Sequence, residues 1–414
     1  MSEDIIGPLE KCQICGQSLE LILSLGHQAL VHGHLTSKQL NEPETTYPLN
    51  LCRCSSCGLL QLNHIVDPKV VFHKNYPYQT GMTNMLIENF RSLAATMAEK
   101  FKLTKDDLVV DIGSNDGTLL KQFVPYGARV LGVEPTNAAS VAEKNGITTV
   151  NDFFTEEIAK KIVDDHGKAK VITATNVFAH VNNLFPMLRG IDTMLSEDGV
   201  FVSESQYLFD VIKKLEFDTI YHEHLRYYSL KPLISLFSKV NFSIVDAERI
   251  TAAGGSIRVF AMKGTRPPSD RLVSLIAEEE KAGLYDKKAL EKFGQRAIDI
   301  KHKLLDLLLE CKKGGNRIVG VGAPARSNTL LGFSHIDHNI LDYACEKAGS
   351  PKIGLYTPGT HIPIVDEQRI FEDQPEYALI LSWHIQDELI KKMREGGFKG
   401  KIIVPLPEPR IVGN

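Results

Sequence analysis

The sequence predicts an α/β protein with two parallel β-sheets and a small cysteine-rich module in front of them. Two C-x-x-C pairs lie within the first 57 residues. From Asp107 onward, short apolar stretches alternate with helical patterns, as is typical of parallel βαβ units. A long amphipathic pattern at 289–315 precedes a second strand, glycine-rich turn and helix. We therefore expect three domains, at residues 1–66, 67–250 and 251–414.

Composition argues against several classes of partner. The 414 residues are 43% hydrophobic and 24% charged, with a formal net charge of −4, which suits an ordinary globular protein. This charge predicts no affinity for nucleic acid or for an anionic membrane. The first residues lack the basic and apolar regions of a signal peptide, and no apolar run reaches the roughly 20 residues of a membrane helix. We expect a soluble, cytoplasmic protein that is a monomer or a weak oligomer.

The cysteine-rich module predicts a metal site. Five of the seven cysteines lie before residue 58, and clustered cysteines without a secretion signal indicate metal ligands more than disulfides. The pairs Cys12/Cys15 and Cys54/Cys57 are each followed by glycine, which allows the tight turn of a zinc knuckle. Cys52 is a possible substitute ligand, although Cys54 fits the spacing better. Four thiolates leave no position for a catalytic water, so we expect a structural Zn²⁺.

The central region predicts a nucleotide-type fold. Apolar strands are expected in five segments, at 108–112, 129–135, 146–154, 170–181 and 199–205. The first ends in a D-x-G-x-x-x-G turn made by Asp111, Gly113 and Gly117, and Glu134 ends the second. Glycines let a ligand approach the backbone, and a carboxylate at the next strand tip can accept hydrogen bonds from ribose hydroxyls. Taken alone, this pattern is compatible with a dinucleotide.

Two further features favour S-adenosylmethionine. Asn115 and Asp116 stand in the turn, and a carboxylate there repels phosphate but attracts a sulfonium or amino group. A hairpin is expected at 242–250 and 254–264, which resembles the last strand pair of class I methyltransferases. We expect Asp152, or its neighbour Phe153, to contact adenine. Asn176, in the fourth of these segments, is expected to contribute to the same site.

The third region predicts a second α/β half. Its turn reads G-x-G-x-x-A at Gly320, Gly322 and Ala325, and Asp342 follows 22 residues after the first glycine. This formally meets the dinucleotide fingerprint, although one such match is weak. Lys347 and a loop rich in glycine and proline near Pro358 suit a phosphate-bearing ligand.

Several motifs together resemble the sugar C-methyltransferases that act on nucleotide-linked 4-keto deoxyhexoses. They are "CQICG", "RCSSCGLLQL", "NYPYQTG", "DIGSNDG", "GVEP", "TNVFAHV", "FDTIYHEH", "GGSIRV", "GAPARSNT" and "TPGTHIPI". The resemblance covers nearly the whole chain. It implies a class I domain that binds S-adenosylmethionine, a C-terminal Rossmann-like domain that helps to hold the sugar nucleotide, linked to dTDP or GDP, and an active site where the two meet.

The same resemblance implies roles for individual residues. The family's catalytic Tyr, Glu and His fall on Tyr221, Glu223 and His224, and a further catalytic Tyr falls on Tyr76. Contacts with the sugar nucleotide are expected from four residues, which are Tyr78, Arg258, Ser327 and Lys347. His222 occupies a variable slot in the pattern and is not expected to be essential.

Carbon methylation explains why those residue types occur together. Carbon has no lone pair, so the 4-keto group must acidify the C3 proton and a base must remove it. Histidine titrates near neutrality, and we expect His224 to be this base. Tyr221 and Tyr76 would hold the sugar or stabilise the enolate, and Glu223 would orient the site. His180, after the fourth strand, would polarise the C4 carbonyl.

Other interpretations remain open from the sequence. His222 and His224 could chelate a metal, but no third ligand is evident at a usual spacing. An NAD-dependent nucleotide-sugar oxidoreductase or epimerase would use the second glycine turn and Asp342, but no Tyr-x-x-x-Lys pair follows that turn. The chain could also be a non-enzymatic scaffold, or it could methylate an oxygen or a small non-sugar ketone.

Overall fold

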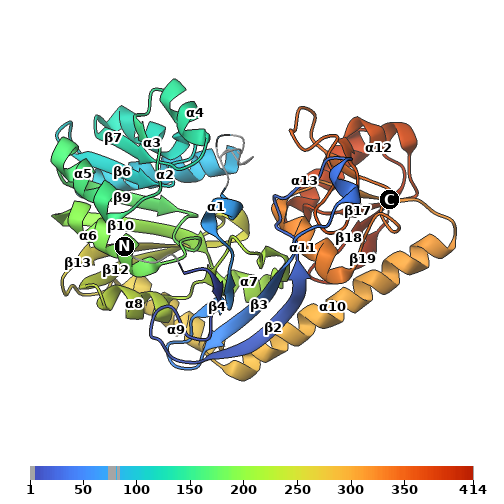
Figure 1. Cartoon of the computed structure of the whole chain (residues 1–414), viewed down its shortest axis with the longest axis horizontal. Coiled ribbons are helices and arrows are strands. Elements are labelled where there is room, and N and C mark those ends of the chain that lie inside the picture. Colours follow the sequence, from blue (N-terminus) through green and yellow to red (C-terminus); the bar gives the residue numbers. More distant parts are fainter. Residues whose placement is uncertain (1–4, 73–80, 82–83, 414) are drawn as a thin grey trace. The chain divides into compact units, whose positions relative to one another are not determined.

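The computed structural model describes residues 5–72, 81 and 84–413 (Figure 1). The chain divides into two compact units, and it passes from one to the other five times. Unit 1 comprises Met1–Glu20, Cys52–Asp210 and Glu223–Tyr285. Unit 2 comprises Leu21–Leu51, Val211–His222 and Asp286–Asn414. The motif "FDTIYHEH" is therefore shared, because the chain changes unit between His222 and Glu223.

Unit 1 contains a seven-stranded sheet in the order β12-β13-β10-β9-β6-β7-β8. The five strands β6 to β10 are parallel, and β13 runs antiparallel to both β10 and β12. The strands are β6 (Leu108–Ile112), β7 (Arg129–Val133), β8 (Thr149–Val150), β9 (Ala169–Thr175), β10 (Leu195–Gln206), β12 (Phe242–Ile250) and β13 (Ser256–Lys263). This arrangement confirms the class I methyltransferase fold that the sequence predicts, including the final hairpin.

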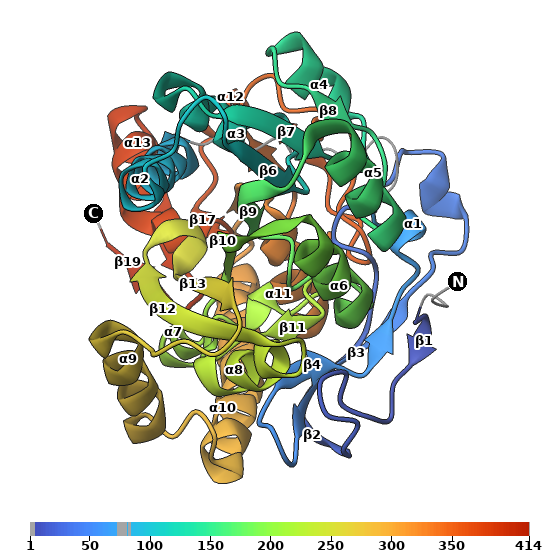
Figure 2. The same ribbon diagram turned by 90° about the vertical axis from the view of Figure 1, so that its left-hand side faces the viewer.

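Helices cover both faces of this sheet, which explains why every residue of β6 is buried. Val110 packs in one core cluster with helices α5, α6 and α8, whereas its neighbour Val109 packs in another with α2, α3 and α4. Figure 2 shows α2 and α3 on the opposite side of the sheet from α5 and α6. The helices are α2 (Asn84–Phe101), α3 (Thr118–Phe123), α4 (Ala138–Lys144), α5 (Glu156–His166), α6 (Leu184–Met194) and α8 (Leu230–Ser238).

Unit 2 contains a six-stranded sheet in the order β16-β15-β14-β17-β18-β19, parallel except for the last pair. It confirms the second α/β sheet expected from the sequence. Its strands are β14 (Ile318–Val321), β15 (Ala344–Glu346), β16 (Ile364–Asp366), β17 (Tyr377–Ile380), β18 (Lys401–Val404) and β19 (Arg410–Val412). Its helices are α10 (Lys287–Lys313), α11 (Ala325–Ser334), α12 (Gln368–Asp373) and α13 (Gln386–Glu395).

Shorter elements complete the two units. In unit 1, β1 pairs with β5 and β4 pairs with β11. These and the remaining elements are β1 (Gly7–Pro8), β2 (Leu19–Gln28), β3 (Tyr47–Cys54), β4 (Leu60–Leu62), β5 (His64–Ile65), β11 (Arg226–Tyr227), α1 (Pro68–Val71), α7 (Leu208–Lys214) and α9 (Asp270–Lys281). Within the described ranges, no helix has both the length and the apolar content that a bilayer span requires.

Candidate active site and metal centre

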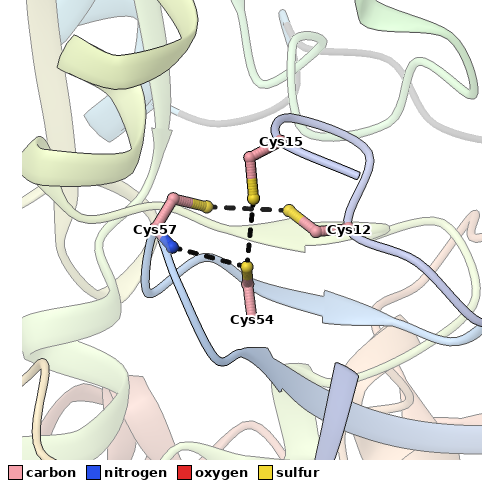
Figure 3. A group of neighbouring side chains, drawn as sticks. All are labelled: Cys12, Cys15, Cys54 and Cys57. Atoms are coloured by element: carbon pink, nitrogen blue, oxygen red, sulfur yellow. Dashed lines mark hydrogen bonds between the residues drawn. The ribbon is translucent and has the colours of Figure 1, made fainter. Parts of the chain in front are cut away.

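The four predicted metal ligands converge on one point. The Sγ atoms of Cys12, Cys15, Cys54 and Cys57 all lie within 4.8 Å of one another, and Figure 3 shows the four side chains pointing inward. Four sulfurs around a zinc ion with Zn–S bonds of about 2.3 Å would stand about 3.8 Å apart. The distances from Cys12 Sγ to Cys57 Sγ and from Cys15 Sγ to Cys54 Sγ are 3.6 and 3.3 Å. The cluster therefore has the dimensions of a tetrahedral zinc site.

The chemistry of the cluster also suits a cation. The contact with Cys57 lowers the pKa of Cys12 to about 5, and the reciprocal contact raises the pKa of Cys57. Backbone N–H groups of Ile14 and Ser56 each donate to a ligand sulfur, at 3.4 Å. Such donors stabilise thiolate, the form that binds metal. Cys52 is buried outside this cluster, and burial raises its pKa to about 11.

The glycine turn after β6 has the conformation that the sequence predicts. Gly113 and Gly117 have φ angles of +69° and +78°, where a side chain is strained. A Cβ atom on Gly113 would lie 2.4 Å from Val177 Cγ2. Asn115 also has a positive φ, of 50°. This turn lies at the carboxyl end of β6, where the sheet order reverses, which is where α/β sheets bind ligands.

Glu134 connects the turn to the next strand. One of its carboxylate oxygens accepts from the backbone N–H of Asn115 at 3.0 Å, and the other accepts from the backbone N–H and hydroxyl of Thr136. The side-chain amide of Asn151 donates to the backbone carbonyls of both Glu134 and Thr136. Sequence reasoning missed Thr136, which follows the predicted strand at 129–135, and Asn151, which lies within the predicted strand at 146–154.

The other predicted cofactor residues follow the same edge of the sheet. Asp152 and Phe153 come after β8 and are exposed, and Asn176 comes directly after β9 with a positive φ of 56°. Asp111, in β6, is only 2% exposed and accepts a hydrogen bond from the Thr173 hydroxyl at 2.7 Å. Burial raises the pKa of Asp111 to about 7 against the effect of that hydrogen bond, with a further contribution from Glu134.

His180 and His224 lie together in unit 1. Their rings stack with centroids 5.1 Å apart and an interplanar angle of 9°. His180 belongs to the loop between β9 and α6, and its ring also stacks on Phe72 with centroids 5.8 Å apart. Burial, and then the neighbouring His224, lower the pKa of His180 well below its ordinary value. Two imidazolium cations at this distance would repel, so the arrangement favours a pair with at least one neutral ring.

The remaining residues of the HEH motif have different surroundings. Glu223 belongs to unit 1 and is 5% exposed. His222 and Tyr221 belong to unit 2. The ring of His222 is 2% exposed, packs edge-on against Tyr47, and has its Nε2 atom 3.3 Å from a backbone carbonyl. Tyr76 and Tyr78 lie outside the described residues.

Sequence reasoning missed a buried ion pair in unit 2 that joins two motifs. The guanidinium of Arg326, from "GAPARSNT", makes two hydrogen bonds of 2.8 Å to the carboxylate of Asp218, from "FDTIYHEH". The indole N–H of Trp383 donates to the same carboxylate at 2.7 Å. Although burial opposes it, Asp218 keeps the pKa of Arg326 above its ordinary value. Asp218 stands three residues before Tyr221, so this pair fixes the start of the segment that carries the tyrosine.

The second glycine turn differs from a dinucleotide site in one respect. Asp342 precedes β15 instead of ending it, and it pairs with Lys312 and Arg317. A ribose-binding carboxylate belongs at the carboxyl end of that strand, because ligands bind at the carboxyl ends of parallel strands. The fingerprint interpretation that used Asp342 is therefore wrong.

The predicted sugar-nucleotide contacts of unit 2 lie near this turn in sequence. Ser327 is fully buried, and its hydroxyl donates to the backbone carbonyl of Pro324 at 2.6 Å. Lys347 follows β15 directly and is exposed. The ammonium of Lys352, which sequence reasoning missed, donates to the carbonyl of Ala323 at 2.7 Å. Lys352 therefore lies against the backbone of the glycine turn.

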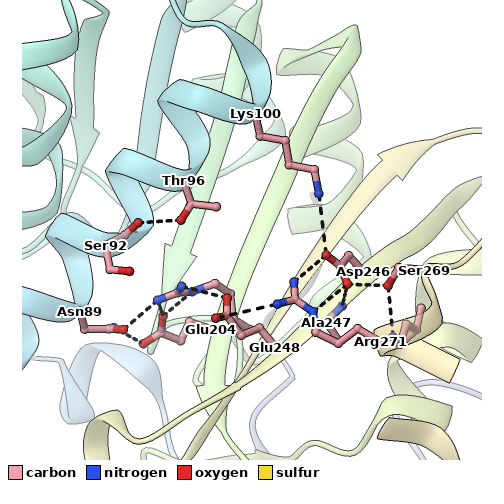
Figure 4. Close-up of polar contacts among 12 residues, drawn as sticks. Asn89, Ser92, Thr96, Lys100, Glu204, Asp246, Ala247, Glu248, Ser269 and Arg271 are labelled. Atoms are coloured by element: carbon pink, nitrogen blue, oxygen red, sulfur yellow. Dashed lines mark hydrogen bonds and ion pairs between the residues drawn. The ribbon is translucent and has the colours of Figure 1, made fainter. Parts of the chain in front are cut away.

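Arg258 is engaged within the sheet of unit 1. Its side chain is 3% exposed and pairs at 3.0 Å with Glu204, which faces it across β10 and β13. It also donates to Asn89 at 2.8 Å and lies 3.4 Å from Glu248. Figure 4 labels its partners Asn89, Glu204 and Glu248. Protein partners therefore hold this guanidinium inside unit 1, and its contact with the substrate stays a prediction.

Comparison with known proteins gives a consistent assignment. Three family models match in succession: "Putative zinc binding domain" at residues 12–72, "Methyltransferase domain" at 78–247 and "C-methyltransferase C-terminal domain" at 251–407.

Among solved structures, magnesium protoporphyrin IX methyltransferase from Synechocystis PCC 6803 matches 48% of this chain and all of its own, at 15% identity and a TM-score of 0.37. An S-adenosylmethionine-dependent methyltransferase from Clostridium acetobutylicum matches 43% of this chain and 92% of its own, at 13% identity and a TM-score of 0.35. Similarities this low carry no argument.

One relative covers the whole chain. C-methyltransferase NovU from Streptomyces niveus is 33% identical over 417 aligned residues, which span 99% of this chain and 98% of the relative. The match runs through the cysteine cluster, the S-adenosylmethionine-type sheet and the second α/β sheet alike. The chain therefore belongs to the C-methyltransferase family that includes NovU.

Proposed function

We propose that the protein transfers a methyl group from S-adenosylmethionine to C3 of a nucleotide-linked 4-keto-6-deoxy or 2,6-dideoxy hexose. A base removes the C3 proton, and the 4-keto oxygen takes the electrons as an enolate. The enolate carbon then attacks the methyl group, the C–C bond forms, and the C–S electrons return to sulfur to leave S-adenosylhomocysteine. The observation that carries this proposal is the stacked pair of His180 and His224. His180 follows β9, at the carboxyl edge of the seven-stranded sheet of unit 1.

The histidine pair supports the proton-transfer step. Burial, and then the neighbouring His224, hold the pKa of His180 well below its ordinary value, so His180 is a neutral ring that stacks on His224. We assign the base to His224 and the hydrogen bond to the C4 oxygen to His180. Glu223 orients this site, and Tyr221 and Tyr76 hold the sugar or stabilise the enolate.

Groups of each unit support the binding of the two substrates. For unit 1, we assign the methyl donor to the turn at Gly113–Gly117, with Glu134 on the ribose hydroxyls, Asp152 or Phe153 at adenine and Asn176 beside them. For unit 2, we assign the nucleotide phosphates to Lys347 and the turn before α11, and a further polar contact to Ser327. The nucleotide is a dTDP or GDP carrier.

A binding panel with an exchange assay tests this proposal. Calorimetry with S-adenosylhomocysteine present is expected to show one nucleotide 4-keto sugar, among dTDP-, GDP- and UDP-linked forms, binding at least about tenfold tighter than the others. In D₂O the protein should then exchange the C3 hydrogen of that sugar without methylating it. Binding of S-adenosylhomocysteine with neither sugar binding nor exchange would assign the protein to another acceptor, and binding of NAD would revive the oxidoreductase interpretation.

The pKa of Asp111 predicts a pH dependence of donor binding. A cationic sulfonium near this carboxylate favours its ionised form, so binding should release a proton near pH 7. The association constant for S-adenosylmethionine is expected to rise about tenfold from pH 6 to pH 8, measured by calorimetry in buffers of different ionisation enthalpy. The raised pKa also means that the ligand-free protein loses stability as the pH rises from about 4 to about 7. Asp111→Asn should bind more weakly and remove both dependences; an unchanged pH profile in that variant would contradict the assignment.

A further inference from the structure

The segments that carry the two stacked histidines are joined by their main chains. The backbone N–H of Leu225 donates to the carbonyl of Ala179 at 3.0 Å. These two residues are the sequence neighbours of His224 and His180, whose ring centroids are 5.1 Å apart. Whatever holds this main-chain contact therefore also sets the separation of the rings.

Arg226 adds a second connection between the same segments. Its guanidinium donates to the carbonyls of Val181 at 2.5 Å and Asn182 at 3.2 Å, directly after His180 in the chain. The arginine is 2% exposed, and burial lowers its pKa. A planar fork that bonds two successive carbonyls fixes the backbone more firmly than a single donor could.

The first knuckle of the metal centre reaches the same loop. Gln13 lies between ligands Cys12 and Cys15, and its side-chain amide donates to the carbonyl of Asn182 at 2.8 Å. Its backbone N–H donates to Gln61 Oε1 at 3.0 Å. The carbonyl oxygen of Asn182 therefore accepts two hydrogen bonds, one from the side chain of Gln13 and one from the guanidinium of Arg226.

The second knuckle reaches the other segment. Strand β4 begins three residues after Cys57 and pairs with β11, with Gln61 opposite Arg226. The backbone N–H of Leu62 donates to the carbonyl of Leu225 at 2.9 Å. Each knuckle therefore holds one of the two histidine-bearing segments.

We propose that Arg226 is a positioning residue that transmits support from the cysteine metal centre to the His180–His224 pair. The centre fixes Gln13 and β4, Gln13 and Arg226 donate to the same carbonyl of Asn182, and the guanidinium of Arg226 holds the two carbonyls that follow His180. This inference rests on the proposed function only in taking the two histidines as the groups that act on the substrate. No protein ligand of the metal takes part in the chemistry.

The test compares Arg226→Met and Arg226→Lys with the surface control Arg271→Met, whose guanidinium pairs with Asp246 at 2.6 Å. Histidine ring signals are recorded by ¹³C NMR without any sugar, and His180→Gln and His224→Gln identify the two resonances. Metal content and affinity for S-adenosylhomocysteine are measured in parallel. In Arg226→Met we expect bound zinc and S-adenosylhomocysteine affinity within about twofold of the parent, but shifted and broadened signals from both rings. The lysine variant should be intermediate, and Arg271→Met should match the parent.

The kinetics of methyl transfer are the second measurement. Where the accepted sugar is known, kcat of Arg226→Met should fall about hundredfold with little change in the KM of the donor, because displaced rings lose alignment and not donor contacts. If Arg226→Met does not fold, Gln13→Leu takes its place as the test variant, because it removes only one hydrogen bond from a half-buried side chain. In Gln13→Leu the signals of both histidine rings should still shift, by less than is expected for the arginine variant. Unchanged ring signals in the folded arginine variant, or in Gln13→Leu if that variant decides, would overturn the inference. Because those signals are recorded without substrate, failure of the proposed sugar chemistry would not produce that result.

Discussion

His224→Asn is expected to lower the rate of methyl transfer by about 10³-fold while the affinity for S-adenosylhomocysteine stays unchanged. General acid–base catalysis by a positioned side chain contributes about 10²–10⁴-fold, and asparagine keeps much of the shape without accepting a proton at C3. Single-turnover kinetics with saturating donor, together with calorimetry, measure the two quantities separately. Hydrogen exchange at C3 should be lost to the same extent as methyl transfer.

His222→Asn is the matched control, because it removes an equivalent ring two residues earlier. His222 is buried against Tyr47 and a backbone carbonyl in unit 2, so its loss should cost stability and change the rate by no more than a few-fold. Equal defects in the two variants would contradict the assignment of the base to His224. Full turnover by His224→Asn would do so directly.

Cys12→Ser is expected to release the zinc and to lower the melting temperature by more than about 10 °C. The four sulfurs close one coordination sphere, and structural zinc sites contribute folding free energy outright. Cys12 and Cys54 also lie in the same core cluster as residues of the seven-stranded sheet, so the loss should extend beyond the knuckles. Metal content by mass spectrometry and calorimetric unfolding measure the two effects.

Cys52→Ala is the control for that variant. Cys52 is buried two residues before a ligand but stands outside the cluster, so the alanine variant should retain one zinc per chain. Loss of zinc from Cys52→Ala, with retention in Cys54→Ala, would show that the ligand set is wrong. A folded, metal-free enzyme whose activity titrated with added zinc would contradict a structural role.

Local patterns in the sequence predict much of this molecule. The C-x-x-C spacing identifies all four sulfurs because each knuckle is a short turn, and positive φ angles at Gly113 and Gly117 match the glycines of the predicted turn. The alternation of strands and helices also predicts both sheets. In these cases the residues that determine a feature lie close together in the chain.

Features that depend on distant residues could not be predicted in the same way. The stacking of His180 on His224 depends on a main-chain bond between the loops, and Arg326 finds Asp218 across 108 positions of sequence. Glu204, the partner of Arg258, is 54 positions away in the sequence and stands opposite it only in the folded sheet. Asp342 matches the spacing of the dinucleotide fingerprint, but it does not end the second strand of that fold, because β15 begins after it.

Transfer of a ¹³C-labelled methyl group tests the central claim most directly. The protein is incubated with S-adenosylmethionine labelled at its methyl carbon and with the nucleotide 4-keto sugar that binds best, and the product is examined by NMR. A new methyl carbon bonded to C3, with one S-adenosylhomocysteine formed per sugar and none formed by His224→Asn, is the result expected here. A methyl group bonded to oxygen, or the same carbon product from His224→Asn, would contradict it.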